Sequence, residues 1–164
     1  MTTSIILTDD WEVRGTGSGN VADLQVKPAK RLMDIYEKHG IRSTFNVEVL
    51  HQLSSLKFCH LSRRMASDVV LWENSVHEML DRDFDVQLHL HPQWWKASFK
   101  HGNWELGKKW NIVDYSKDEI FEMVENAVSY LKSTFSPKLH LCAFRAGSWG
   151  AAPKSRHLQD ALRA

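Results

Sequence analysis

The chain of 164 residues contains few cysteines and no long apolar run. Its two cysteines, Cys59 and Cys142, are too few for the disulfide framework that stabilises small secreted domains. The apolar run at residues 5–7 is soon followed by Asp9 and Asp10, so neither a signal peptide nor a membrane span is expected. These absences predict a cytoplasmic protein with no membrane partner.

The chain also lacks a marked excess of either charge. Its formal net charge is +1, which argues against a dedicated nucleic-acid-binding protein. Hydrophobic residues make up 43% and charged residues 25% of the chain, as in ordinary globular proteins. This length and composition predict one domain over residues 1–164.

Strand and helix patterns alternate along the chain. Apolar or alternating segments at residues 4–8, 41–47, 86–91 and 139–144 predict strands. Helical periodicity and capping residues predict helices at residues 28–39 and 61–81, between Ser116 and Ser136, and from Pro153 onward. This order is typical of an α/β fold with a largely parallel sheet and helical crossovers.

The longest connection, residues 92–114, is rich in aromatic and basic side chains. It holds four tryptophans together with several lysines. Loops of this length are usually functional or disordered, and this one is too aromatic to be disordered. Its indoles can stack on sugars or on nucleobases, or they can fold the loop onto the scaffold.

Two histidines stand at alternate positions just before a proline. His89 and His91 leave the strand at residues 86–91 on the face that also carries Gln87, and Pro92 ends that strand. Two neutral imidazoles so placed can bind one metal ion. The alternative is a pair of half-buried histidines that only form hydrogen bonds.

The carboxyl ends of three expected strands bring chemically useful groups to one rim of a parallel sheet. These groups are Asp9, Asp10, His89, His91 and Arg145. One carboxylate and both imidazoles would hold a metal ion, while the second carboxylate takes a proton from water. A neighbouring arginine would keep that base ionised.

At these residues the chain resembles the polysaccharide deacetylase family, carbohydrate esterase family 4. Thr8-Asp9-Asp10 is similar to its first motif, His91-Pro92 to its second, and Phe144-Arg145-Ala146-Gly147-Ser148-Trp149 to its third. The resemblance implies that Asp9 is the catalytic base and that Arg145 pairs with it. It also implies Asp10, His89 and His91 as metal ligands.

The resemblance implies a function as well. The fold would be part of a distorted (β/α) barrel, and the cofactor a divalent ion, with Zn²⁺ expected. The reaction would be hydrolysis of an N-acetyl or O-acetyl group on a sugar or polysaccharide. Removal of an N-acetyl group would make the protein an enzyme that acts on a C–N bond other than a peptide bond. Trp94, Trp95 and Trp149 are the expected substrate-binding residues.

The chain departs from the family pattern in two places. That pattern sets its two ligand histidines four residues apart, which falls on Gln87, and His89 is the available substitute on the same face. The family's last motifs, with the histidine that acts as general acid, have no counterpart. The domain is therefore expected to be incomplete at its carboxyl end.

Three other interpretations remain. The chain can be a truncated, catalytically impaired relative that binds a metal or a carbohydrate, and its unclosed sheet edges would favour self-association. Membership of another class of His-x-His metallohydrolase is disfavoured. In those families the His-x-His pair usually lies at the end of the first strand, where this chain carries Asp9 and Asp10. Nucleic-acid binding through the tryptophan-rich loop is not supported by the charge balance.

Overall fold

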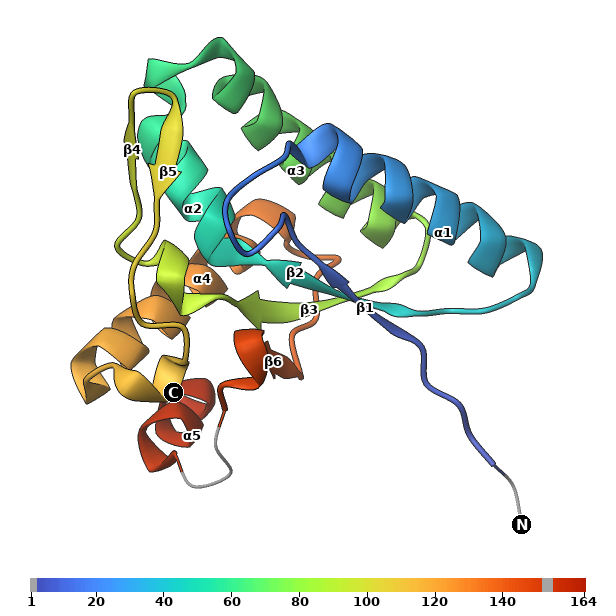
Figure 1. Ribbon diagram of the computed structural model, residues 1–164. Helices are drawn as coiled ribbons and strands as arrows, with labels where there is room; N and C mark the ends of the chain where they lie inside the picture. Colours follow the sequence, from blue (N-terminus) through green and yellow to red (C-terminus); the bar gives the residue numbers. More distant parts are fainter. Residues whose placement is uncertain (1–2, 152–154) are drawn as a thin grey trace.

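A computed structural model describes residues 3–151 and 155–164. Its centre is a parallel sheet of four strands in the order β1-β2-β3-β6. The strands are β1 (Thr8–Trp11), β2 (Thr44–Glu48), β3 (Asp85–Leu90) and β6 (Phe144–Ala146). The sheet curls into a half-barrel (Figure 1). The α/β class, the parallel sheet and the likeness to part of a (β/α) barrel are confirmed.

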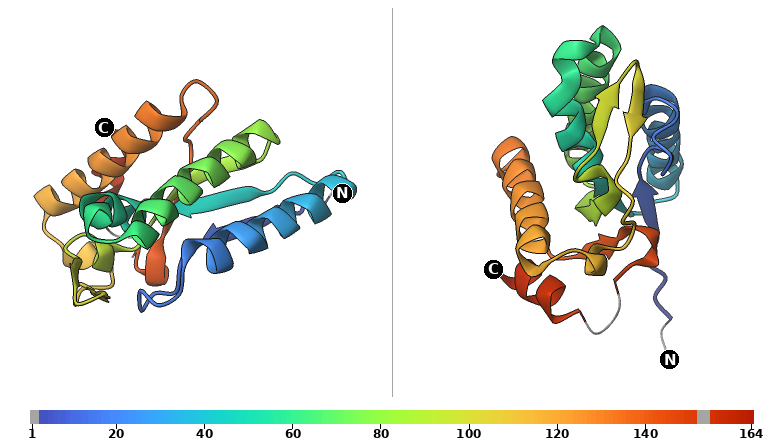
Figure 2. Two further views of the ribbon diagram at one scale, coloured as in Figure 1. Left: turned by 90° about the horizontal axis from the view of Figure 1, so that it is seen from above. Right: turned by 60° about the vertical axis from the view of Figure 1, so that its left-hand side comes forward.

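Helices form the crossovers between the strands, and one more helix, α5, follows the last strand. They are η1 (Ala22–Val26), α1 (Lys27–Lys38), α2 (Val49–Phe58), η2 (Cys59–Leu61), α3 (Arg63–Asp81), α4 (Lys117–Phe135) and α5 (Arg156–Arg163). Helices α1, α3 and α4 follow one another around the sheet in chain order (Figure 2). No helix in the described ranges is long and apolar enough to cross a membrane.

The connection from β3 to α4 is more ordered than its length predicts. It contains η3 (Pro92–Trp94), β4 (Ser98–Lys100), β5 (Asn103–Glu105) and η4 (Ile112–Asp114). Strands β4 and β5 form an antiparallel hairpin. No sequence pattern indicates this hairpin, because each strand is only three residues long.

One face of the sheet packs against the helices and forms the core. Its buried side chains are those of Trp11, Phe45, Val47, Val86, Leu88 and Leu90. The indole of Trp11 contacts that of Trp72 in α3, with ring centroids 5.3 Å apart. Because side chains alternate along a strand, the opposite, concave face carries the residues in between.

The helix signals were mostly reliable, although one helix was missed. Helix α1 lies within one residue of its predicted range, and α4 begins with the capping box formed by Ser116 and Glu119. Helix α2 follows β2 without any turn residue, and Glu48 caps it with its side chain. Both polar and apolar residues of α2 are buried, so it has no amphipathic pattern to detect.

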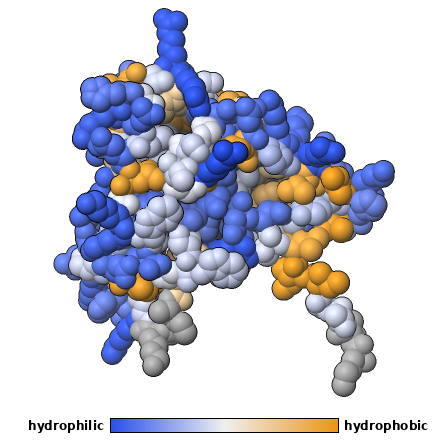
Figure 3. Space-filling model, viewed as in Figure 1, coloured by the Kyte–Doolittle hydropathy of each residue, from blue (hydrophilic) through white to orange (hydrophobic). Residues whose placement is uncertain are grey.

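The first strand lies further along the chain than predicted. The predicted strand at residues 4–8 overlaps β1 only at Thr8. Ile5 and Ile6 are 83% and 81% exposed, and hydrophobic atoms gather on this amino-terminal segment in Figure 3. The strand begins at Thr8 because its ladder partner β2 begins at Thr44, and an apolar run without a partner strand is not held in a sheet.

The fourth strand is also displaced, and a side chain explains why. Residues 139–143 were predicted as strand, but β6 begins at Phe144. The Gln87 side chain donates to the carbonyl of His140 and accepts from the backbone N–H groups of Cys142 and Ala143. The segment therefore bonds to a side chain in place of a strand backbone.

The carboxyl-terminal helix is present, but it begins at Arg156, because Ser155 has an extended backbone and caps it. Pro153, the expected start of that helix, lies outside the described residues. Helix α5 packs against α4 and buries Leu158 and Ala161. In the part of the chain that the structure describes, β1 and β6 form the two edges of the sheet, and self-association through them stays a prediction.

Candidate metal site

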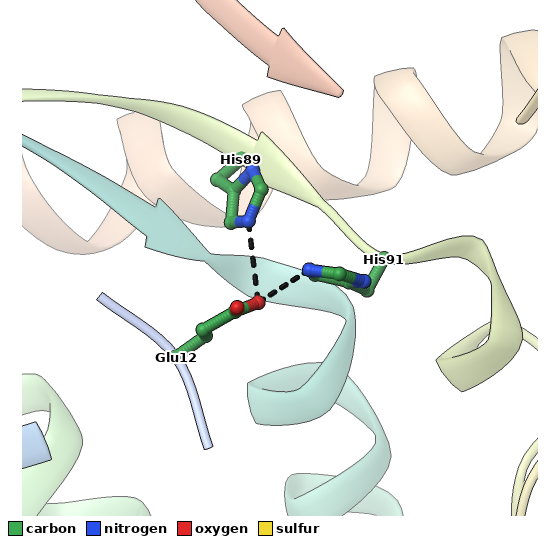
Figure 4. Close-up of side chains that lie close together, drawn as sticks. All are labelled: Glu12, His89 and His91. Atoms are coloured by element: carbon green, nitrogen blue, oxygen red, sulfur yellow. Dashed lines mark hydrogen bonds and ion pairs between the residues drawn. The ribbon is translucent and has the colours of Figure 1, made fainter. Parts of the chain in front are cut away.

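Three side chains converge at the carboxyl ends of β1 and β3. Glu12 follows β1, His89 lies in β3, and His91 follows it (Figure 4). Each offers one ligand atom, and the three atoms lie within 4.8 Å of one another. Glu12 Oε2 is 3.3 Å from Nε2 of His89 and also contacts Nε2 of His91. The expected convergence of the two imidazoles is therefore present.

The register of the sheet explains why the carboxylate is that of Glu12. Asp10 pairs with Asn46 and Asn46 with Gln87, whereas His89 pairs with Glu48, two residues further along β2. Side chains on one face recur every second residue, about 7 Å apart. Glu12 thus continues the face of Asp10 to the level of His89.

A backbone carbonyl fixes which nitrogen of His89 faces Glu12. Its Nδ1 lies 2.9 Å from the carbonyl oxygen of Arg145, an acceptor, so Nδ1 carries the proton. Nε2 therefore faces Glu12, where it donates to the carboxylate when the ring is protonated. In the neutral ring, the lone pair of Nε2 is available to a metal ion. Such a hydrogen bond is the usual way in which proteins orient a histidine for metal binding.

The side-chain amide of Gln93 contacts Nδ1 of His91, as the Arg145 carbonyl contacts Nδ1 of His89. The Gln93 side chain is fully buried, its amide nitrogen lies 3.2 Å from Nδ1 of His91, and its amide oxygen has no partner among the described residues. In this orientation the amide donates to Nδ1, so Nε2 of His91 carries the proton shared with Glu12. A half-turn of the amide lets its oxygen accept from Nδ1–H and frees Nε2 for a metal.

The three groups are electrostatically coupled. Burial raises the pKa of Glu12, but the hydrogen bonds from His89 and His91 outweigh it and bring the pKa down to about 2. Burial lowers the pKa of His89, but Glu12 and the Arg145 carbonyl outweigh it and raise that pKa above its ordinary value. The carboxylate is thus ionised at neutral pH, and it favours the protonated form of His89.

A buried carboxylate holds the end of β3 in place. Glu48 is fully buried and accepts hydrogen bonds from the backbone N–H groups of Leu50, His51 and His91. Burial raises the pKa of Glu48, although His91 and the hydrogen bonds oppose the increase. Glu48 therefore ties the first turn of α2 to the residue that presents the second imidazole.

The segment after β6 closes against His91. A Cβ atom on Gly147 would lie 2.6 Å from Cγ and Nδ1 of the His91 ring and 2.7 Å from the carbonyl oxygen of Leu90. Only glycine fits such a close approach. This contact places the glycine of the third family-like motif directly against a candidate metal ligand.

The two predicted acids lie apart from the imidazoles. Asp9 points to the helix-covered face of β1 and accepts a hydrogen bond from the hydroxyl of Tyr36. Burial raises the pKa of Asp9. Asp10 lies on the concave face, where Arg145 donates to its carboxylate at 2.6 Å and to the hydroxyl of Thr8 at 2.6 Å. The observed carboxylate–arginine pair is therefore Asp10–Arg145, and Glu12 takes the place expected for Asp10 beside the histidines.

The three tryptophans expected to bind substrate differ in exposure. Trp94 is 1% exposed and packs against Trp104 and His51, so it offers no face to a sugar and belongs to the core. Trp95 is half-buried against that core. Trp149 is fully exposed and has a φ of 56°, in the region that non-glycine residues rarely adopt.

Sequence reasoning missed Glu12, Glu48 and Gln93. Glu12 could have been found from its position two residues after Asp10, on the same face of a strand. The first strand was predicted at residues 4–8, too early for Glu12 to be counted with it. Gln93 follows His91 by two residues, but no pattern indicates that a side chain after a proline turns back on the ring before it. Glu48 stands at the end of a strand-like run. Its role as the N-cap of α2 could not be predicted, because α2 itself was not predicted.

Comparisons of the chain with family models, curated proteins and solved structures find no match. The likeness to polysaccharide deacetylases therefore stays a sequence-based expectation.

Proposed function

We propose that this protein is a metal-dependent hydrolase that removes acetyl groups from a sugar or polysaccharide. The observation that carries the proposal is the convergence of Glu12, His89 and His91 at the carboxyl edge of the sheet. Sites in parallel α/β barrels are built at that edge. The motif resemblance supplies the acetylated sugar as the expected substrate.

The donor set suits Zn²⁺. One carboxylate and two imidazoles are the protein ligands of many catalytic zinc sites, and three ligands leave positions open for water and substrate. The chemistry that bound zinc supplies is that of a Lewis acid, which lowers the pKa of a water ligand and polarises a carbonyl oxygen. The Arg145 carbonyl holds His89 in the tautomer that this role requires, and the Gln93 amide would do the same for His91 once its oxygen is turned towards Nδ1.

Asp10 is the proposed general base. It lies on the same face of β1 as Glu12, one side-chain level before it, and its carboxylate is held by Arg145. The guanidinium holds that carboxylate in an orientation that suits it to accept a proton from the attacking water. Asp9, on the opposite face beside Tyr36, has a structural role in this proposal.

The exposed indole of Trp149 is the proposed contact for the acetylated sugar. It follows Gly147, whose backbone lies against His91. An exposed aromatic ring near the site suits the apolar face of a sugar ring. Trp94 is not part of this proposal, since its ring is in the core.

The test begins with zinc binding by the purified protein, measured by competition with a chromogenic chelator. Glu12→Gln should weaken zinc binding at least 100-fold, because it removes the only charged ligand of the group. Glu122→Gln makes the same chemical change on the exposed face of α4 and should bind zinc as the wild type does. A wild-type protein that binds no zinc would contradict the proposal.

Deacetylation of chitotetraose, followed as released acetate, tests turnover. Asp10→Asn should keep zinc and lose on the order of 10²–10⁴-fold in rate, as expected for loss of a general base. Asp9→Asn should retain activity. Zinc and sugar binding without any release of acetate would favour the alternative function, a binding protein without turnover.

A further inference from the structure

A cavity lies at the same edge of the sheet as the metal site. Its volume is about 680 Å³. Its walls come from the loop after β1, from α2 and the start of α3 after β2, and from the β4–β5 hairpin after β3. Figure 1 shows these segments grouped at one end of the half-barrel. Connections that follow the strands are where α/β barrels bind ligands.

Aromatic side chains and a glycine loop form one wall. Trp104 and Phe99 of the hairpin line the cavity, and their ring centroids are 5.1 Å apart. Gly17, with φ of +77°, brings the loop against them, and a Cβ atom there would lie 3.1 Å from Cβ of Trp104. The loop is thus packed on the indole, which makes this wall an ordered apolar surface.

Polar groups with unused hydrogen-bonding capacity form the other wall. The side chain of Asp68 is 17% exposed, and its nearest cation in the described part of the chain is Arg64, 3.7 Å away. Arg64 also donates to the carbonyl oxygen of Gly19 at 2.7 Å. The Asp68 carboxylate accepts no hydrogen bond from any residue that the structure describes.

A buried histidine is the second such group. His51 is 6% exposed, its Nδ1 has no partner among the described residues, and its Nε2 is 3.4 Å from the hydroxyl of Ser55. Both residues line the cavity. Burial lowers the pKa of His51 to about 4, so the ring is neutral at neutral pH. Buried polar atoms without partners are rare in folded proteins and call for an explanation such as a ligand.

The lining favours a neutral, hydroxylated ligand. Asp68 and Arg64 have opposite charges, and His51 and Ser55 carry none, so no net charge is offered to an ion. An aromatic wall facing a carboxylate and a hydroxyl matches a sugar ring, which has apolar faces and a rim of hydroxyl groups. The volume is within the range of small-molecule sites.

We propose that this cavity binds a sugar unit of the glycan whose acetylated residue lies at the metal site. This inference rests on the proposed function. Glu12 and Val13 join the two sites along the chain, and the carboxylate of Glu48 accepts from the backbone of both His51 and His91. The two sites are therefore held by the same backbone segments, and they would bind neighbouring sugar units of one glycan.

The experiment is calorimetric titration of chitotetraose into zinc-free Glu12→Gln protein, in which the metal site is disabled. The expected result is measurable binding that Asp68→Asn, added to Glu12→Gln, weakens at least tenfold. Asp118→Asn, the same change on the exposed start of α4, should leave binding unchanged. Ser55→Ala should weaken binding by a smaller factor, and circular dichroism checks that each variant is folded.

The two proposals fail in different ways. Chitotetraose binding that persists without zinc and depends on Asp68, in a protein that never releases acetate, supports the cavity and removes the hydrolase. Zinc-dependent release of acetate with no effect of Asp68→Asn or Ser55→Ala on binding removes the cavity and keeps the hydrolase. Inorganic phosphate that binds through Arg64, as tested with Arg64→Gln, would overturn the choice of a neutral ligand.

Discussion

The two faces of the sheet carry residues of opposite character. On the helix-covered face, Phe45, Val86 and Leu88 are buried among other apolar groups. On the concave face the matching positions are Asp10, Asn46, Gln87, His89 and Arg145. The first face shows how an amphipathic pattern specifies a fold. The second shows polar groups that bond to one another and, at one end, bring three potential metal-ligand atoms together.

Because the two faces differ, the alternation of apolar and polar residues indicates both a strand and the face that carries its chemical groups. In a parallel sheet covered on both faces, strands are continuously apolar. Here the alternation of Val86, Leu88 and Leu90 with polar residues indicated a strand and at the same time indicated its chemical face. Four predictions test this division, from the largest expected effect to the smallest.

The first prediction concerns the helix-covered face. Phe45→Ala should lower the free energy of unfolding by about 3–5 kcal/mol, because it leaves a cavity beside Phe84 in the core. Urea denaturation followed by circular dichroism measures the loss. Thr44→Ala, on the concave face one residue earlier, should cost less than about 1 kcal/mol. Equal losses at the two positions would show that the faces do not differ in this way.

The second prediction concerns the polar groups behind the metal ligands. Gln93→Leu should weaken zinc binding by about 10–100-fold, the usual effect of removing a group that orients a histidine ligand. Gln93→Glu keeps an acceptor oxygen for Nδ1 of His91 and should retain most of the affinity. Gln159→Leu on the exposed face of α5 is the control. Unchanged zinc affinity in Gln93→Leu would mean that the amide does not orient the ring.

The third prediction uses His51, which lies in the first turn of α2 and packs against Trp94 and Trp104. Its pKa in the folded protein is about 4, below the ordinary 6.5, so the unfolded chain takes up the proton first as the pH falls. Stability should therefore decline between pH 6.5 and pH 4, by up to about 2 kcal/mol at pH 5. Unfolding curves at several pH values measure this decline.

A variant isolates the contribution of His51 from that of the other titrating groups. His51→Phe keeps an aromatic ring against Trp94 and removes the titration. The decline in stability from pH 7 to pH 5 should be smaller in this variant than in the wild type. Equal declines in the two proteins would show that His51 is not held neutral by its surroundings.

The fourth prediction concerns the ion pair across the open side of the half-barrel. Both side chains of the Asp10–Arg145 pair are 39% exposed, so Arg145→Ala should cost at most about 1 kcal/mol. Arg82 contacts three carboxylates on α1 and α3 and is less exposed. Arg82→Ala should therefore destabilise the protein more in the same denaturation experiment, and the reverse order would contradict this comparison.

Much of the fold could be predicted from local patterns. The parallel alternation, the position of α1, the capping box of α4 and the end of β3 before Pro92 all depend on residues close together in sequence. The failures depend on distant partners: β1 was placed too early because its partner strand sets its start, and residues 139–143 bond to the side chain of Gln87.

The sequence by itself determined that His89 and His91 share one side of a strand, since the period of a β-strand is a local property of the chain. Only the tertiary structure decided that Glu12, and neither Asp9 nor Asp10, meets them. That choice depends on the register between strands that are more than thirty residues apart, and a shift of two residues along a strand moves a carboxylate by about 7 Å. A metal ion requires ligands within a few ångströms of one another, so the register decides which acid is available.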